Sequence, residues 1–189
     1  MFIGIDPSLS NTGVVILSDE GDYLWAGQIP TDKADPMHVR CRSTATQILN
    51  ACSKHEDCKW DVFIESPGGA LQGQAGDLRT LFWVIVEELT TWEHATVSIY
   101  SMAPNGLTKW ITGSGSAKAG DKAYHVSQKY MQLLPNEFHA TDATKPKGLM
   151  RWADLWDGLC LCLVGRQYMG LDEGNQKQKE AVQGIKKIV

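Results

Sequence analysis

Apolar and polar positions follow two different periods along this chain. Short apolar runs bounded by turn residues predict five β-strands, at residues 2–6, 12–17, 23–28, 60–65 and 95–101. Longer segments with apolar residues at helical spacing predict helices at residues 37–53, 77–92, 104–112, 120–134 and 149–168. Asp77 stands at the start of the second helix, where it is expected to be the N-cap.

The order of these elements predicts an α/β fold. The first three strands are too close together for crossover helices, so they are expected to form an antiparallel meander. Helices then alternate with the last two strands, which fits a ribonuclease H-like mixed five-stranded sheet: three antiparallel strands, then two parallel ones, with helices on both faces. Other α/β folds share this order. We assign residues 1–170 to one domain and residues 171–189 to a polar C-terminal tail, expected to be loose at its end.

Charge is distributed unevenly along the 189 residues. The net charge is −4, which alone argues against a nucleic-acid partner. Residues 1–108 hold six Lys and Arg against fourteen Asp and Glu, whereas residues 109–151 hold seven against three. A basic middle segment can give a local positive surface on an acidic chain.

The sequence predicts a cytoplasmic protein that has no contact with a membrane. It has no basic leader at the N-terminus and no apolar run of 18 residues. Its five cysteines are irregularly spaced without a C-x-x-C pair, so we expect reduced thiols rather than disulfides or a zinc site. If the chain is viral, the compartment would be the cytoplasm of the host cell.

Four carboxylates occupy places where an acid is costly. Asp6 ends the first strand, Glu65 ends "VFIE" just before "SPGG", and Asp154 and Asp157 share one face of an otherwise apolar helix. Buried acids need a partner or a metal ion. Each alone has a structural explanation: an Asx turn, the start of a loop, or a helix cap. Together they favour a site for a hard cation, Mg²⁺ or Mn²⁺.

These residues lie in segments that resemble a known family. In order, "GIDPSLSNTG", "VFIE", "GSGSAKAGDKAYHV" and "ADLWDGLCLC" resemble motifs of the RuvC-type Holliday-junction resolvases, over residues 2–168. The resemblance leaves open a cellular or a phage-type member. It implies a nuclease domain over residues 1–170, with two Mg²⁺ or Mn²⁺ ions held by Asp6, Glu65, Asp154 and Asp157. It also implies a catalytic lysine near the reacting phosphate, for which Lys122 is our choice and Lys118 competes.

The resemblance further implies what the protein acts on. The substrate would be a four-way DNA junction, cleaved at paired phosphodiesters in recombination or repair by a homodimer whose symmetry matches that of the junction. The helix at 77–92 is apolar on more than one face, so it could serve as core and dimer interface together or could simply be a buried helix. The expected DNA-binding residues are Lys109, Lys118 and Lys122. Gly68, Gly69 and Gln72 are added because their glycine-rich loop directly follows Glu65, although that loop could instead be only a flexible linker to the next helix.

Other functions fit parts of the pattern. An actin-like or sugar-kinase-like nucleotide-binding protein also opens with a strand, an Asp and a small-residue turn, but usually needs a duplicated fold about twice this long. A non-catalytic junction-binding module would not need four intact acids. A related nuclease acting on flaps, forks or RNA–DNA hybrids is the main alternative, because "Ser-Leu-Ser" replaces the family's frequent "Gly-Ser" in the first motif.

Overall fold

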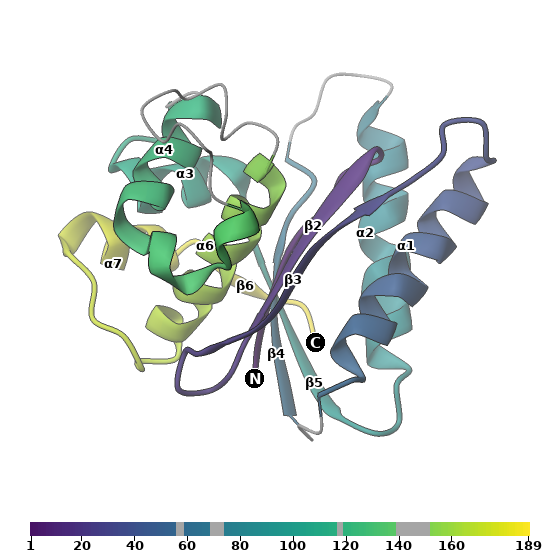
Figure 1. Cartoon of the computed structure of the whole chain (residues 1–189), viewed down its shortest axis with the longest axis horizontal. Helices are drawn as coiled ribbons and strands as arrows, with labels where there is room; N and C mark the ends of the chain where they lie inside the picture. The colour runs from purple at the N-terminus through teal and green to yellow at the C-terminus, as the bar shows by residue number, and fades with distance from the viewer. Residues whose placement is uncertain (56–58, 69–73, 117–118, 139–151) are drawn as a thin grey trace.

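A central six-stranded sheet organises the molecule (Figure 1). The computed structural model describes residues 1–55, 59–68, 74–116, 119–138 and 152–189. The strand order is β3-β2-β1-β4-β5-β6. The strands are β1 (Phe2–Asp6), β2 (Asn11–Leu17), β3 (Tyr23–Pro30), β4 (Lys59–Glu65), β5 (Thr96–Met102) and β6 (Lys186–Lys187). The five predicted strands and the ribonuclease H-like architecture are confirmed, and a sixth strand adds to them.

Strand directions bring three strand ends to one edge of the sheet. β1, β2 and β3 form the predicted antiparallel meander. β4 pairs with β1 and β5 pairs with β4, both in parallel, and β6 pairs with β5 in antiparallel fashion. β1, β4 and β5 therefore all end at the same edge, which is where open α/β sheets commonly place their sites.

Helices cover both faces of the sheet (Figure 1). They are α1 (Met37–Cys52), α2 (Gln74–Thr90), α3 (Pro104–Thr112), α4 (Ala119–Tyr130), α6 (Ala153–Tyr168) and α7 (Gln176–Val182). α1 and α2 pack together and share one apolar core with their face of the sheet. The second core lies between the other face and α6, which is buried along most of its length, with α3 and α4 outside it.

Two expectations about local structure were wrong. Asp77 does not cap α2, because the helix begins at Gln74 and Asp77 lies within its first turn. The segment after residue 170 is not loose. Its helix α7 packs on α3, and Ala181 and Ile185 are buried in the core around α6.

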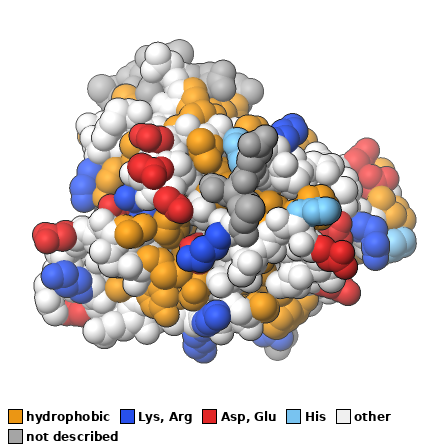
Figure 2. Space-filling view, turned by 90° about the horizontal axis from the view of Figure 1, so that it is seen from below, with side chains coloured by type: hydrophobic (Ala, Val, Ile, Leu, Met, Phe, Trp, Pro, Cys, Tyr) orange, Lys and Arg blue, Asp and Glu red, His pale blue; other side chains and the backbone are white. Residues whose placement is uncertain are grey.

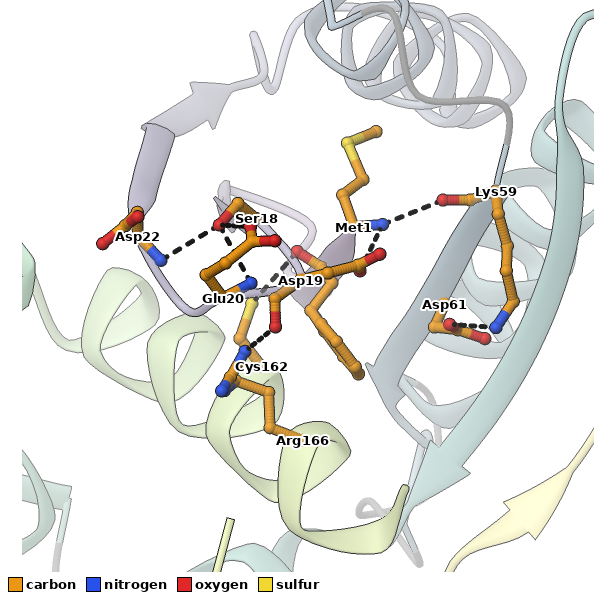
Figure 3. A network of polar contacts seen from close by, with 10 residues as sticks. Met1, Ser18, Asp19, Glu20, Asp22, Lys59, Asp61, Cys162 and Arg166 are labelled. Carbon is orange, nitrogen blue, oxygen red and sulfur yellow. Dashed lines mark hydrogen bonds and ion pairs between the residues drawn. The ribbon is translucent and has the colours of Figure 1, made fainter. Parts of the chain in front are cut away.

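A polar network ties together the opposite end of the sheet, where β1 and β4 begin (Figure 3). The amino group of Met1 contacts the Asp19 carboxylate at 2.8 Å and donates to the carbonyl oxygen of Lys59 at 2.9 Å. Arg166 of α6 donates to the Asp19 carbonyl oxygen and, through two nitrogens, to Asp172. This network joins the β2–β3 turn to α6, far from the edge where β1 and β4 end.

Two further features concern the apolar content of the helices and the state of the cysteines. Within the described residues, no helix is both long and apolar enough to cross a membrane. Cys41, Cys52, Cys160 and Cys162 are free and buried, and Cys58 lies outside the described residues.

Candidate active site

Asp6 and Glu65 lie side by side on parallel strands. Ile5 of β1 is in register with Ile64 of β4, so the next residue of each strand is an acid. Side chains alternate between the two faces of a sheet. Phe63, two residues before Glu65, belongs to the core on the α6 side, so both carboxylates face α6.

α6 approaches this part of the sheet unusually closely. A Cβ atom at Gly4 would overlap the carbonyl oxygen of Gly158, and one at Gly13 would overlap the backbone of Asp154. Only glycine permits such backbone contact. The last residue of "GIDPSLSNTG" therefore lets the first turn of α6 lie against β2 and brings Asp154 and Asp157 toward the strand ends.

The four carboxylates share one electrostatic environment. Burial raises the pKa of Asp6 well above its ordinary value, and the charges of Glu65, Asp157 and Asp154 raise it further. Burial, and next the charge of Asp157, raise the pKa of Glu65 to about 7. Burial also raises the pKa values of Asp154 and Asp157. The structure thus brings all four predicted acids together, and Lys122 opposes these shifts in each case.

Among the described residues, Lys122 of α4 is the cation that faces this acid cluster. Its Nζ donates to Asp157 Oδ2 at 2.6 Å, and both side chains are only about one-eighth exposed, at 12% and 13%. Burial acts to lower the pKa of Lys122, but the charge and hydrogen bond of Asp157, together with the charges of Glu65 and Asp6, raise this pKa overall. Of the two lysines weighed from the sequence, Lys122 is therefore at the acids, and Lys118 lies outside the described residues.

Asn11 is a site residue that the sequence reasoning missed. Its Nδ2 donates to Asp154 Oδ2 at 3.4 Å and so helps orient that carboxylate. The signal was present in the sequence, because Asn11 and Gly13 belong to the same opening motif as Asp6. Thr12 between them is fully buried and bonds to both Ser8 backbone groups, which fixes the loop after Asp6.

The donor set fits a hard divalent cation, although the described side chains do not form a complete coordination site. Among the described residues, no three His, Cys, Asp or Glu side chains stand at metal-ligand spacing. The cluster nevertheless offers only oxygen donors, which suit Mg²⁺ or Mn²⁺. Glu65 Oε2 is buried without a hydrogen-bond partner, and Asp157 is held by an ammonium instead. An added cation would favour the charged forms of the four carboxylates, which burial disfavours in every case and neighbouring carboxylates disfavour further for Asp6, Glu65 and Asp154.

The other predicted DNA-binding residues have different surroundings. Lys109 of α3 is ion-paired with Glu180 of α7 at 2.9 Å. Gly68 lies beside Pro104. A Cβ atom added at Gly68 would be only 3.2 Å from the ring of Pro104. Gly69 and Gln72 lie outside the described residues. Neither Lys109 nor Gly68 has a described contact with the acid cluster.

Comparison with known proteins identifies the fold. It is the ribonuclease H-like fold in its RuvC form. RuvC of Thermus thermophilus in complex with a Holliday junction substrate aligns with a TM-score of 0.63 at 17% identity, covering 90% of this chain and 96% of that one. A second T. thermophilus RuvC structure aligns with a TM-score of 0.61 at 19% identity, covering 89% and 96%. No family model and no curated protein sequence matches the chain.

Proposed function

We propose that this protein is a divalent-metal-dependent, structure-selective endodeoxyribonuclease that resolves four-way DNA junctions by paired phosphodiester cleavage in recombination and repair. The observation that carries the proposal is the convergence of Asp6, Glu65, Asp154 and Asp157 at one edge of a RuvC-like sheet. The RuvC that this chain resembles was solved with a Holliday junction substrate. The fold and the acids together favour the same chemistry on the same kind of DNA.

Different residues of the chain would bind the metal ions, orient a carboxylate and neutralise the phosphate. Asp6, Glu65, Asp154 and Asp157 would hold two Mg²⁺ or Mn²⁺ ions. When bound, such ions lower the pKa of water and stabilise charge on the oxygens of the phosphodiester. Asn11 would keep Asp154 oriented. Lys122, once released from Asp157, would neutralise the phosphate beside the acids.

We further propose that the protein acts as a homodimer on branched DNA. Two symmetric cuts need two sites, and a two-fold dimer supplies them. α2 supports this assignment. Leu81, Phe82 and Ile85 are buried in the core, yet Trp83 between them is 56% exposed. Lys109, Lys118, Lys122 and the loop containing Gly68, Gly69 and Gln72 remain our proposed DNA contacts. The free, buried cysteines favour a cytoplasmic location.

The opposite end of the molecule does not suit DNA on electrostatic grounds. That end is the face drawn in Figure 2, where Lys and Arg side chains are interspersed with Asp and Glu. A mixed surface does not attract a polyanion as a continuous basic one does. The site edge, with its metal-binding acids and Lys122, is the proposed DNA side.

Substitution of the acids tests the proposed chemistry. Asp6→Asn, Glu65→Gln, Asp154→Asn and Asp157→Asn should each abolish Mg²⁺-dependent cleavage of a synthetic junction, because each removes a metal ligand. Gel-shift assays should show that junction binding persists. If two of these variants cleave at a rate near that of the wild type, the site has been assigned to the wrong residues.

A further inference from the structure

A hollow of about 550 Å³ lies beside the proposed active site. One wall is the loop of residues 7–10, which directly follows Asp6, and the opposite wall is the start of α1, with Met37 and Arg40. The first turns of α2 contribute Asp77 and Leu78. The hollow therefore borders the loop after Asp6 on the α1 and α2 side of the sheet, whereas the carboxylates and Lys122 lie on the α6 side.

Arg40 is held in a fixed position in this hollow. Its Nη2 donates to the Leu9 carbonyl oxygen, and Nε and Nη2 lie 3.3 and 3.2 Å from Thr31 Oγ1. Thr31 Oγ1 itself donates to the Leu9 carbonyl oxygen at 2.6 Å. None of these hydrogen bonds uses Nη1 of the Arg40 guanidinium. A planar, pre-positioned guanidinium of this kind is well suited to bind a phosphate.

The other lining residues indicate how a nucleotide would be oriented. Lys33 is exposed at the rim and adds a second positive charge. Leu9, Met37 and Leu78 provide apolar surface for a sugar or base. Asp77 disfavours a phosphate at the α2 wall, but its carboxylate can accept a hydrogen bond from the exocyclic amine of cytosine or adenine.

We propose that this hollow binds a nucleotide of the DNA strand that flanks the cleaved phosphodiester, with Arg40 and Lys33 holding its phosphate and the base directed toward Asp77. The inference rests on the proposed function and extends it. It adds a contact on the side of the acids opposite Lys122, so that the strand is held on both sides of the reacting bond. Holding a substrate in register on two sides is what positions one particular bond for cleavage.

A salt titration of junction binding tests the proposal. The Asp154→Asn background keeps the synthetic four-way junction uncut, and Arg40→Gln and Lys33→Gln are then compared with Arg42→Gln. Arg42 is the matched control, because it is exposed on the same helix but lines a different hollow between α1 and α2. Each lost phosphate contact should reduce the slope of log affinity against log salt by about one. Arg40→Gln and Lys33→Gln should show this loss, and Arg42→Gln should not.

Neutral linkages locate the contact on the DNA. Single methylphosphonates are placed at successive positions on either side of the cut. One position should weaken binding when Arg40 is present and have no effect in Arg40→Gln, because the two changes remove the same interaction. Equal effects of every linkage with and without Arg40 would overturn the proposal.

The variants also separate this inference from the function on which it rests. If all three variants bind the junction with the same salt slope as the protein without these substitutions, the hollow does not hold a phosphate, whereas the junction-binding function stands. If the protein with an intact hollow does not bind the junction, the proposed function and this inference both fail. Because Arg40 also ties down the loop after Asp6, thermal unfolding is recorded for each variant. If Arg40→Gln is unfolded, Lys33→Gln decides the question, since Lys33 is an exposed side chain.

Discussion

Glu65 shows how the acid cluster opposes folding when no cation is bound. Burial and the charge of Asp157 raise its pKa from 4.5 to about 7. Between these values the folded protein keeps a proton that the unfolded chain has lost. The stability that this proton contributes is fully present below about pH 4.5 and is lost as the pH rises through about 7.

Glu65→Gln should therefore stabilise the metal-free protein at pH 8, by about 1–3 kcal/mol. The difference should shrink at pH 5, where the wild-type side chain is already neutral. Urea denaturation in EDTA measures both values. Adding Mg²⁺ should stabilise the wild type more than the variant, because bound cations stabilise the native state. A variant less stable than the wild type at pH 8 would contradict the raised pKa of Glu65.

Lys122 and a metal ion should compete for Asp157. The ammonium is 2.6 Å from Asp157 Oδ2 in a buried setting, so Lys122→Met leaves an unpaired buried charge and should destabilise the metal-free protein by about 3 kcal/mol. The same change should increase affinity for Mn²⁺, measured by calorimetry, about tenfold or more.

Lys109→Met is the matched control for this competition. Its ion pair with Glu180 is much more exposed, and such pairs contribute little. Mn²⁺ affinity should therefore stay unchanged in Lys109→Met. Equal affinities in the Lys122 and Lys109 variants would show that the ammonium does not occupy the cation site.

At the residue scale, the sequence predicted that the four acids lie together, but it did not predict the residues that position them. Asp6, Glu65, Asp154 and Asp157 could be predicted because each interrupts an apolar run. Asn11 and Gly13 belong to the same opening motif as Asp6, but their roles were not predicted, because a small polar stretch after a strand is equally typical of an ordinary turn. Their roles depend on the approach of α6, which lies more than 140 residues away along the chain.

The C-terminal segment is the element that sequence patterns described least well. β6 has only two residues, both Lys, and this gives no alternation from which to predict a strand. α7 is a polar helix, QKQKEAV, whose start is fixed by reciprocal bonds between Asn175 and Gln178. Such short elements depend on tertiary packing rather than on their own propensity.

Ala181→Glu should test whether α7 is a true part of the core. Ala181 is 5% exposed and packs in the core around α6. Burying a charge there should cost about 2–4 kcal/mol, measured as a lower urea midpoint. Glu180→Ala, one residue earlier and exposed, should change the midpoint little. If both variants unfold at the wild-type midpoint, the segment contributes no core packing.

For the whole molecule, the two ends of the sheet have different roles. The Arg166–Asp19–Met1 network holds the end where β1 and β4 begin, through bonds that are already satisfied (Figure 3). The opposite edge gathers four acids whose charges repel one another. This contrast is typical of proteins that accept local instability at a functional site.

Assembly of two molecules through α2 is a prediction at this scale. Sedimentation at micromolar concentration should show a dimer, because Trp83, exposed beside the buried apolar residues of α2, suits an apolar interface. Trp83→Asp should shift the protein toward monomer without lowering its stability. A wild-type monomer, both free and bound to a junction, would contradict the dimer.

The overall architecture followed from strand order, because closely spaced strands allow only an antiparallel meander. What could not be derived from the sequence is the substrate, since flaps, forks and hybrids present the same phosphodiester to the same acids. Discrimination among them would depend on the surfaces around the site.

The most direct test of the central claim is a cleavage assay on a matched set of DNA substrates. A synthetic four-way junction, a flap, a fork, an RNA–DNA hybrid and a linear duplex are compared with Mg²⁺, using the wild type and Asp154→Asn. We predict that the wild type cuts the junction fastest, with paired nicks in strands of like polarity, and that Asp154→Asn cuts none of them. Failure to cut the junction, or equally fast cutting of the flap, fork or hybrid, would contradict the account.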